Sequence, residues 1–312
     1  MNNSLQHSSE LRPTTALVLA GAGAAGNAWQ LGLIAGLYDA GVNLTTAGLI
    51  VGTSAGSTVA AQITSGTSPA ELYAAILAET PPPRASAAGS GTGRARLSGP
   101  QYLAWSDAII ASSEDASDMR RRFGAAALEL DRSDGSDSTR WHDIVAARLP
   151  RHEWPQQRML IPAMDARTGE PVVFDRDSEV ELIDAVAAST SAMTPYRIGE
   201  RRFLNGGYRR SSNTDLAAGC ARVLVLEPFG GRTRQPIEWG MDLATQVDEL
   251  RSGGSVVETV FPDGGSGDVF NANALDPATR RPAARGGYEQ GRGLAARVAE
   301  FWQDAEPDME LN

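Results

Sequence analysis

Apolar and polar positions form alternating blocks near the start of the chain, and these blocks predict strands and helices in turn. Residues 15–20 and 47–51 are short apolar runs with the length of buried strands. Between them, apolar residues recur at helical spacing over residues 27–40, and Gly41 marks the helix end. A second helix is predicted over residues 57–65. Two successive strand–turn–helix units predict parallel strands covered by helices.

The second half of the chain continues this pattern. Six further segments have the apolar periodicity of regular structure: strands at 158–163, 170–174, 222–226 and 257–261, a helix at 178–189, and a hairpin at 197–204. One long surface helix is predicted over 277–305, after a loop at 252–256. No internal repeat or second domain boundary is visible, so we expect one α/β domain over 14–305. Its fold should be a three-layer α/β/α fold with a mostly parallel central sheet. A disordered tail is predicted at 1–13 and a C-terminal tail at 306–312.

The segment 80–140 interrupts this alternation. A helix predicted over 69–78 ends at a triple proline, and composition predicts flexible loops at 84–99 and 131–139. Between the loops, residues 100–130 look helical in two pieces, with these apolar side chains: Tyr102, Leu103, Trp105, Ile109 and Ile110. The segment is interpreted either as a helical part of the core or as a mobile lid over an apolar pocket.

Charge and cysteine content narrow the choice of partners and location. The 312 residues carry a formal net charge of −10, which disfavours nucleic acid as a partner and disfavours charge-driven binding to an anionic membrane. The single cysteine, Cys220, rules out an intrachain disulfide and is expected to be a small buried residue. No secretory signal or apolar run of about 18 residues is visible, so we expect a cytoplasmic protein.

The strongest chemical motif is Gly52-Thr-Ser54-Ala55-Gly56, between a predicted strand and a predicted helix. This context is that of a nucleophile elbow, in which glycines flank a sharply turned serine because larger side chains would collide there. The N-terminus of the next helix faces this serine, so its free amides can stabilise negative charge. The alternative is a tight turn that carries a serine without catalytic use.

A histidine base for Ser54 is not evident. The histidines are His7, His142 and His152, and none lies in the last half of the chain, where an α/β-hydrolase would need one. A Ser-His-Asp triad is therefore disfavoured, and a carboxylate is the next candidate for the base. No ligand-spaced cluster of histidines or cysteines occurs, so we expect no metal and no other cofactor.

A second glycine-rich turn, Gly21-Ala22-Gly23-Ala-Ala-Gly26, joins the first strand to its helix. Backbone amides that converge in such a turn suit an oxyanion or a phosphate. The spacing also fits a dinucleotide fingerprint, but the acidic residue expected about 20 positions later is missing, which disfavours a nucleotide-binding oxidoreductase. With the elbow on the neighbouring strand, Gly21, Ala22, Gly23 and Ala55 are predicted to form the oxyanion hole of an acyl-transfer site.

These two motifs, followed by Ala187–Pro195 and by Phe203-Leu-Asn205-Gly206-Gly207-Tyr, resemble the patatin-like phospholipases over residues 14–230. That family carries G-G-G-x-[RK]-G, then G-x-S-x-G, and later D-G-[GA] with a catalytic Asp. The resemblance implies a patatin-like fold and a phospholipase A or esterase type of lipid acyl hydrolase. It also implies a Ser–Asp dyad with Ser54 as nucleophile and position 205 as base, acting on an acyl lipid or ester. An apolar lid would make transient contact with a membrane or micelle.

The chain departs from the family pattern at Ala22, Ala25 and Asn205. The last departure is the most serious because a neutral amide cannot accept the Ser54 proton, so the dyad is expected to be impaired. The nearest carboxylate in sequence, Asp215, is interpreted as structural. Three explanations stay open: an inactivated variant, a pseudo-enzyme that binds acyl lipid or a protein partner, and deamidation of Asn205 before Gly206.

Overall fold

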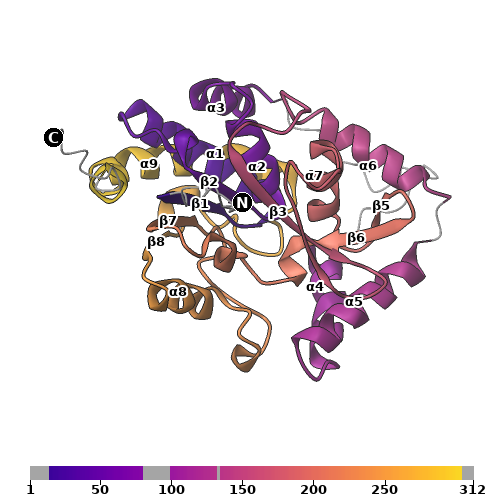
Figure 1. Cartoon of the computed structure of the whole chain (residues 1–312). Helices are drawn as coiled ribbons and strands as arrows, with labels where there is room; N and C mark the ends of the chain where they lie inside the picture. The colour runs from indigo at the N-terminus through magenta and orange to yellow at the C-terminus, as the bar shows by residue number, and fades with distance from the viewer. Residues whose placement is uncertain (1–13, 80–98, 132–133, 304–312) are drawn as a thin grey trace, which may run out of the picture.

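The structure is a computed structural model that describes residues 14–79, 99–131 and 134–303 (Figure 1). The tails predicted at 1–13 and 306–312, and most of the loop predicted at 84–99, lie outside the described residues. None of the helices in the described ranges is long and apolar enough to cross a membrane.

The parallel part of the sheet has β1 at its centre. The order β3–β2–β1–β7–β8 is formed by β1 (Thr15–Leu19), β2 (Leu49–Gly52), β3 (Arg158–Asp165), β7 (Arg222–Leu226) and β8 (Val256–Val260). Helices cover both faces of this sheet, so every residue of β1 after Thr15 is buried. This explains why the first apolar run is continuous instead of alternating, and it confirms the mostly parallel sheet.

An antiparallel extension is built on the second half of β3. There β3 pairs with β4 (Pro171–Phe174) and with β6 (Arg201–Asn205), and β6 pairs with β5 (Tyr196–Ile198). The β5–β6 pair is the hairpin predicted at 197–204. The parallel sheet therefore continues into an antiparallel corner, and the last residue of β6 is Asn205.

Two helical layers enclose the sheet, as the three-layer prediction expected. Leu17 and Leu19 face one layer, and Ala16 and Val18 face the other, because successive strand residues point to opposite faces. The first layer contains α1 (Gly23–Asp39), α2 (Ala55–Ile63), α3 (Pro69–Ala78), α7 (Leu182–Thr190) and α9 (Arg280–Gln303). The second is formed by α8 (Leu243–Ser252) and a short turn at Thr214–Ala217; Figure 1 shows α8 on the side of the strands opposite α1.

The backbones of helices α9 and α1 pack in direct contact. A Cβ atom on Gly32 would lie 2.1 Å from the carbonyl oxygen of Ala284, and one on Gly287 would lie 2.3 Å from that of Trp29. Glycines therefore allow the two helices to touch directly. The predicted surface helix at 277–305 begins at Arg280, and its inner face is buried against α1.

The segment predicted as an insertion forms α4 (Gly99–Ala111), α5 (Ala116–Leu130) and α6 (Ser136–Ala146). Helices α4 and α5 share a small apolar core with the ends of β3 and β6, in which Met119 and Phe123 pack near Leu204 and Tyr208. In Figure 1 the two helices lie at the β6 end of the sheet. The loop predicted at 131–139 is shorter than expected because α6 already begins at Ser136.

One helix begins later than predicted, and another was not predicted. The helix predicted at 178–189 begins only at Leu182, because Asp175 and Ser178 close a turn by hydrogen bonds of 2.6 and 2.9 Å and Glu179 has a φ of 54°. Helix α8 was not predicted at all. Its signal was present, since Asp242 caps it and the buried residues Leu243, Gln246, Val247 and Leu250 follow at helical spacing.

Candidate active site

Ser54 lies on the turn between β2 and α2, as the motif predicted. Its φ of 53° and ψ of −120° fall in a region that non-glycine residues rarely occupy. A Cβ atom on Gly56 would lie 2.0 Å from the carbonyl oxygen of Leu19, and one on Gly52 would lie 2.7 Å from that of Gly56. Both motif glycines therefore let α2 start hard against β1 and β2, which forces the turn at Ser54.

The turn after β6 brings Asn205 to Ser54. Val51 pairs with Leu160 on β3, whereas Asn205 pairs with Ala163, three residues further along that strand. Ser54 is likewise three residues past Val51, so the two turns reach the same level of β3. The Asn205 Nδ2 donates a hydrogen bond of 2.9 Å to the Ser54 Oγ. Residues 151 positions apart are thus in direct contact.

The polarity of this contact is set by the neighbouring backbone. The Gly207 N–H donates to the Asn205 Oδ1 at 2.9 Å, so the amide oxygen faces Gly207 and the amide nitrogen faces Ser54. A Cβ atom on Gly206 would lie 2.2 Å from the carbonyl oxygen of Pro162, so this turn packs against β3 only because residue 206 is a glycine. The side chain at 205 therefore gives Ser54 a donor where a carboxylate would give it an acceptor.

The first glycine-rich turn lies beside the same hydroxyl. A Cβ atom on Gly21 would lie 3.0 Å from the Ser54 Cβ. Helix α1 begins at Gly23 instead of Asn27, so most of the predicted donor turn is the first turn of a helix, where amides lack intrahelical acceptors. Two of these amides do have acceptors: the Ala25 N–H donates to the Ala274 carbonyl outside the helix (2.9 Å), and the Gly26 N–H makes the first bond of the helix, to the carbonyl of the N-cap residue Ala22 (3.0 Å).

The remaining amides are the donors available for an oxyanion. Among the described residues, the N–H groups of Gly21, Ala22, Gly23, Ala24 and Ala55 have no hydrogen-bond acceptor. The Ser54 N–H is not available, because it donates to the Ser189 Oγ of α7 at 3.0 Å. Ser189 lies within the segment Ala187–Pro195 that resembles the family, but no sequence pattern predicts this contact.

A buried carboxylate lies directly after β7. The Glu227 side chain is only 5% exposed, and burial raises its pKa from 4.5 to about 7, against the opposing effect of hydrogen bonds from the Ser212 Oγ and the Phe229 N–H. The Ser212 carbonyl accepts a hydrogen bond of 3.3 Å from the Thr53 Oγ1, which places this group next to the Ser54 turn. No sequence motif marks Glu227 as part of the site.

Tyr208 connects the site to helix α4. Its hydroxyl donates to the Ala192 carbonyl at 2.5 Å, lies 3.2 Å from the Tyr102 hydroxyl, and its ring stacks on Phe123. Burial raises the pKa of Tyr208 well above its ordinary value. The side chain three residues after Asn205 is therefore neutral and fixed.

Other titratable residues considered from the sequence are engaged elsewhere. Asp215 forms a bidentate ion pair with Arg209, with oxygen–nitrogen distances of 2.9 and 2.7 Å. His142 and His152 interact with Asp143 and with the Ala146 carbonyl, on or near α6, and His7 lies outside the described residues. Within the described ranges, no group of three or more His, Cys, Asp or Glu side chains could hold a metal ion.

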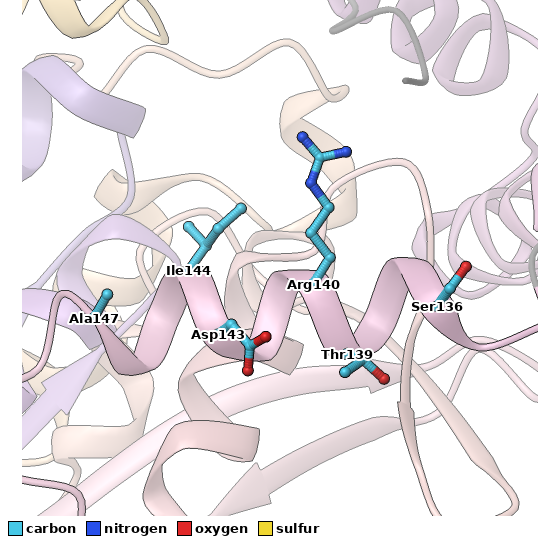
Figure 2. Close-up of a pocket in the computed structure, with 6 residues that line it drawn as sticks. All are labelled: Ser136, Thr139, Arg140, Asp143, Ile144 and Ala147. Atoms are coloured by element: carbon cyan, nitrogen blue, oxygen red, sulfur yellow. The ribbon is translucent and has the colours of Figure 1, made fainter. Parts of the chain in front are cut away.

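Two surface depressions have lining residues that include neither Ser54 nor Asn205. The larger, of about 700 Å³, lies along α6 and is lined by Ser136, Thr139, Arg140, Asp143, Ile144 and Ala147. Figure 2 shows these side chains leaving different sides of one helix instead of converging on a common point. The other, of about 590 Å³, lies between α4 and residues 233–239. Neither offers convergent polar groups at the candidate site.

Comparison with known proteins identifies one family and several chains of known structure, including two of low sequence identity. No curated protein sequence matches this chain. VipD from Legionella pneumophila is 12% identical with a TM-score of 0.42, over 92% of this chain and 67% of its own. The type III effector protein ExoU is 15% identical with a TM-score of 0.32, over 90% of this chain and 54% of its own. The sequence model of the patatin-like phospholipases matches residues 17–218, more than half of the chain, so the protein belongs to the patatin-like phospholipase family.

Proposed function

We propose that Ser54 is the nucleophile of a lipid acyl hydrolase, and that position 205 is its dyad partner, which Asn205 leaves without a base. Family membership supports the hydrolysis of lipid esters as the activity class. The observation that carries the finer assignment is the 2.9 Å contact between the Asn205 Nδ2 and the Ser54 Oγ. It joins the strained elbow to the position where the family pattern has an aspartate.

With a carboxylate at position 205, the chemistry follows directly. The carboxylate takes the Ser54 proton while Oγ attacks the ester carbonyl, and the amides of Ala22, Gly23 and Ala55 hold the oxyanion. The leaving alcohol takes the proton back from the carboxylic acid as the acyl–oxygen bond breaks. Water then repeats the cycle on the acyl-enzyme, releasing a fatty acid and free Ser54.

The amide of Asn205 blocks the first proton transfer. It has no acceptor to offer Ser54, and its N–H already occupies a lone pair of the attacking oxygen. Positioned general bases contribute on the order of 10² to 10⁴ in rate. We therefore expect the chain to hydrolyse esters about 10²- to 10⁴-fold more slowly than its Asn205→Asp variant.

The test compares hydrolysis of a p-nitrophenyl acyl ester by the chain and by Asn205→Asp. Asn43→Asp is a matched control, because it adds the same charge at an exposed position where an oxygen still accepts the Thr45 N–H. Ser54→Ala in the Asn205→Asp background should abolish the gained activity. A peptide mass spectrum must first show that residue 205 is still asparagine, which excludes prior deamidation. An Asn205→Asp variant no faster than the chain would refute the dyad.

A second candidate function is favoured by the reversed contact at Ser54. A donor on the serine oxygen suits a non-catalytic protein that holds an acyl lipid or a partner in the same site. A fluorophosphonate distinguishes the two: labelling of Ser54 in the Asn205→Asp variant supports the hydrolase, and failure to label either form supports the binding protein. Contact of an 80–140 lid with a lipid surface stays a prediction.

A further inference from the structure

The fully buried side chain of Asn213 contacts both turns of the candidate site. The Asn213 Nδ2 lies 3.1 Å from the Thr53 Oγ1, 3.0 Å from the Gly206 carbonyl oxygen and 3.0 Å from the Arg210 carbonyl oxygen. Thr53 immediately precedes Ser54, and Gly206 immediately follows Asn205. Two amide hydrogens shared among three acceptors therefore bridge the elbow to the turn that carries position 205.

The orientation of this amide is fixed from its other end. The Asn213 Oδ1 accepts a hydrogen bond of 2.9 Å from Arg209, whose guanidinium is itself held by Asp215. An amide turned by 180° would set its N–H₂ group against the guanidinium, so only one orientation is satisfied. The φ of Asn213 is 55°, a left-handed conformation that asparagine tolerates better than most residues.

The neighbouring residue anchors this bridge to the sheet. The Ser212 carbonyl accepts from the Thr53 Oγ1 at 3.3 Å, and its hydroxyl donates to Glu227 at the end of β7. Thr53 is therefore both a donor to residue 212 and an acceptor for Asn213. The Thr53 hydroxyl therefore links the elbow to residues 212 and 213. Ser212 is in turn hydrogen-bonded to Glu227 after β7.

We infer that Asn213 is a positioning residue for the reaction of Ser54, and that its amide sets the separation between the elbow and the turn carrying position 205. This inference rests on the proposed function. It follows because proton transfer between those two turns needs hydrogen-bond contact, and a displacement of about 1 Å can cost about 10²-fold in rate. Asn213 reaches neither reacting atom and acts through Thr53 and Gly206 alone.

The experiment uses the Asn205→Asp background and a pair of nearly isosteric changes at the elbow. Thr53→Val removes the hydroxyl that accepts a hydrogen bond from the Asn213 Nδ2 and donates one to the Ser212 carbonyl, whereas Thr53→Ser keeps this hydroxyl. We expect kcat for a p-nitrophenyl acyl ester to fall about 10- to 100-fold in Thr53→Val, with KM within about threefold, and to be restored in Thr53→Ser. Asn213→Asp, which lacks the amide donors, should show the same selective loss of kcat.

Ser68→Ala separates positioning from general destabilisation. It removes the capping box of α3, in which Ser68 and Glu71 bond each other's backbone, and should lower Tm without changing kcat. A kcat in Thr53→Val within twofold of its parent overturns the inference, and the Thr53 pair decides the matter even where Asn213→Asp does not fold. An inactive Asn205→Asp parent instead overturns the proposed function, and this inference with it.

Discussion

The buried carboxylate of Glu227 should make the stability of the protein fall as the pH rises from about 4.5 to about 7. Burial holds the pKa of this group near 7 in the folded protein, against an ordinary value of 4.5. Between these two values the folded chain keeps a proton that the unfolded chain has lost. The stabilisation is therefore complete below about pH 4.5 and is lost as the pH rises through about 7.

The size of the effect follows from the distance between the two pKa values. A rise from 4.5 to about 7 corresponds to at most about 3 kcal/mol of unfolding free energy between pH 4 and pH 8. Glu227→Gln should abolish this contribution, because glutamine stays neutral at all these pH values. Its carbonyl oxygen can still accept the Phe229 N–H, and its N–H₂ group can donate to the Ser212 hydroxyl.

The assay is urea unfolding of both proteins at pH 5, 6, 7 and 8, with the free energy of unfolding extrapolated to water. All other titrating groups are shared, so the difference in pH slope reports Glu227 alone. Glu238→Gln removes a carboxyl at an exposed position and is the matched control, which should keep the parental slope. Parallel pH profiles for the chain and Glu227→Gln would refute this assignment.

Three further changes test the packing that supports the site. Gly56→Ala should lower Tm and, in the Asn205→Asp background, ester turnover, because the added Cβ would lie 2.0 Å from a β1 carbonyl oxygen; an unchanged Tm would contradict the close approach of α2. Gly287→Ala should cost about 1–3 kcal/mol by separating α9 from α1 at the Trp29 carbonyl, as chemical unfolding would measure. Asp215→Asn should cost about 1–3 kcal/mol, since it leaves the half-buried Arg209 with a neutral partner; equal unfolding midpoints would show that the pair contributes nothing.

The parts of the fold that the sequence predicted are those with strong local signals. The buried strands β1 and β2, and the glycine-flanked turn at Ser54, depend on runs of a few residues whose side chains decide their own conformation. The start of α1 was misplaced for the opposite reason. Gly23 and Gly26 resemble a loop by propensity, yet both lie in the first turn of α1, where a Cβ would lie 2.6 Å from the Leu275 side chain at Gly23 and 2.4 Å from the Ala22 Cβ at Gly26.

The contacts behind the site have no local signal. The segment that holds Asn213 reads as a polar loop, and Glu227 reads as the end of an apolar strand. Their relation to Thr53 depends on β1 lying between β2 and β7, an order that hydrophobic periodicity does not specify. Asn213 reaches Thr53 across 160 positions, so only the folded chain reveals the bridge.

The contacts that hold the turns around Ser54 do not depend on whether the side chain at position 205 can accept a proton. The elbow is held by the start of α2 and by Ser189, and the turn at 205 is held by Gly206 against β3 and by Asn213. None of these contacts uses the Asn205 Nδ2. Replacing that nitrogen by oxygen would therefore leave the turn in place, with the Gly207 N–H still bonded to the other oxygen. Under the proposed dyad, the difference between a hydrolase and a lipid-binding relative then depends on whether one atom, already 2.9 Å from the Ser54 Oγ, can accept a proton.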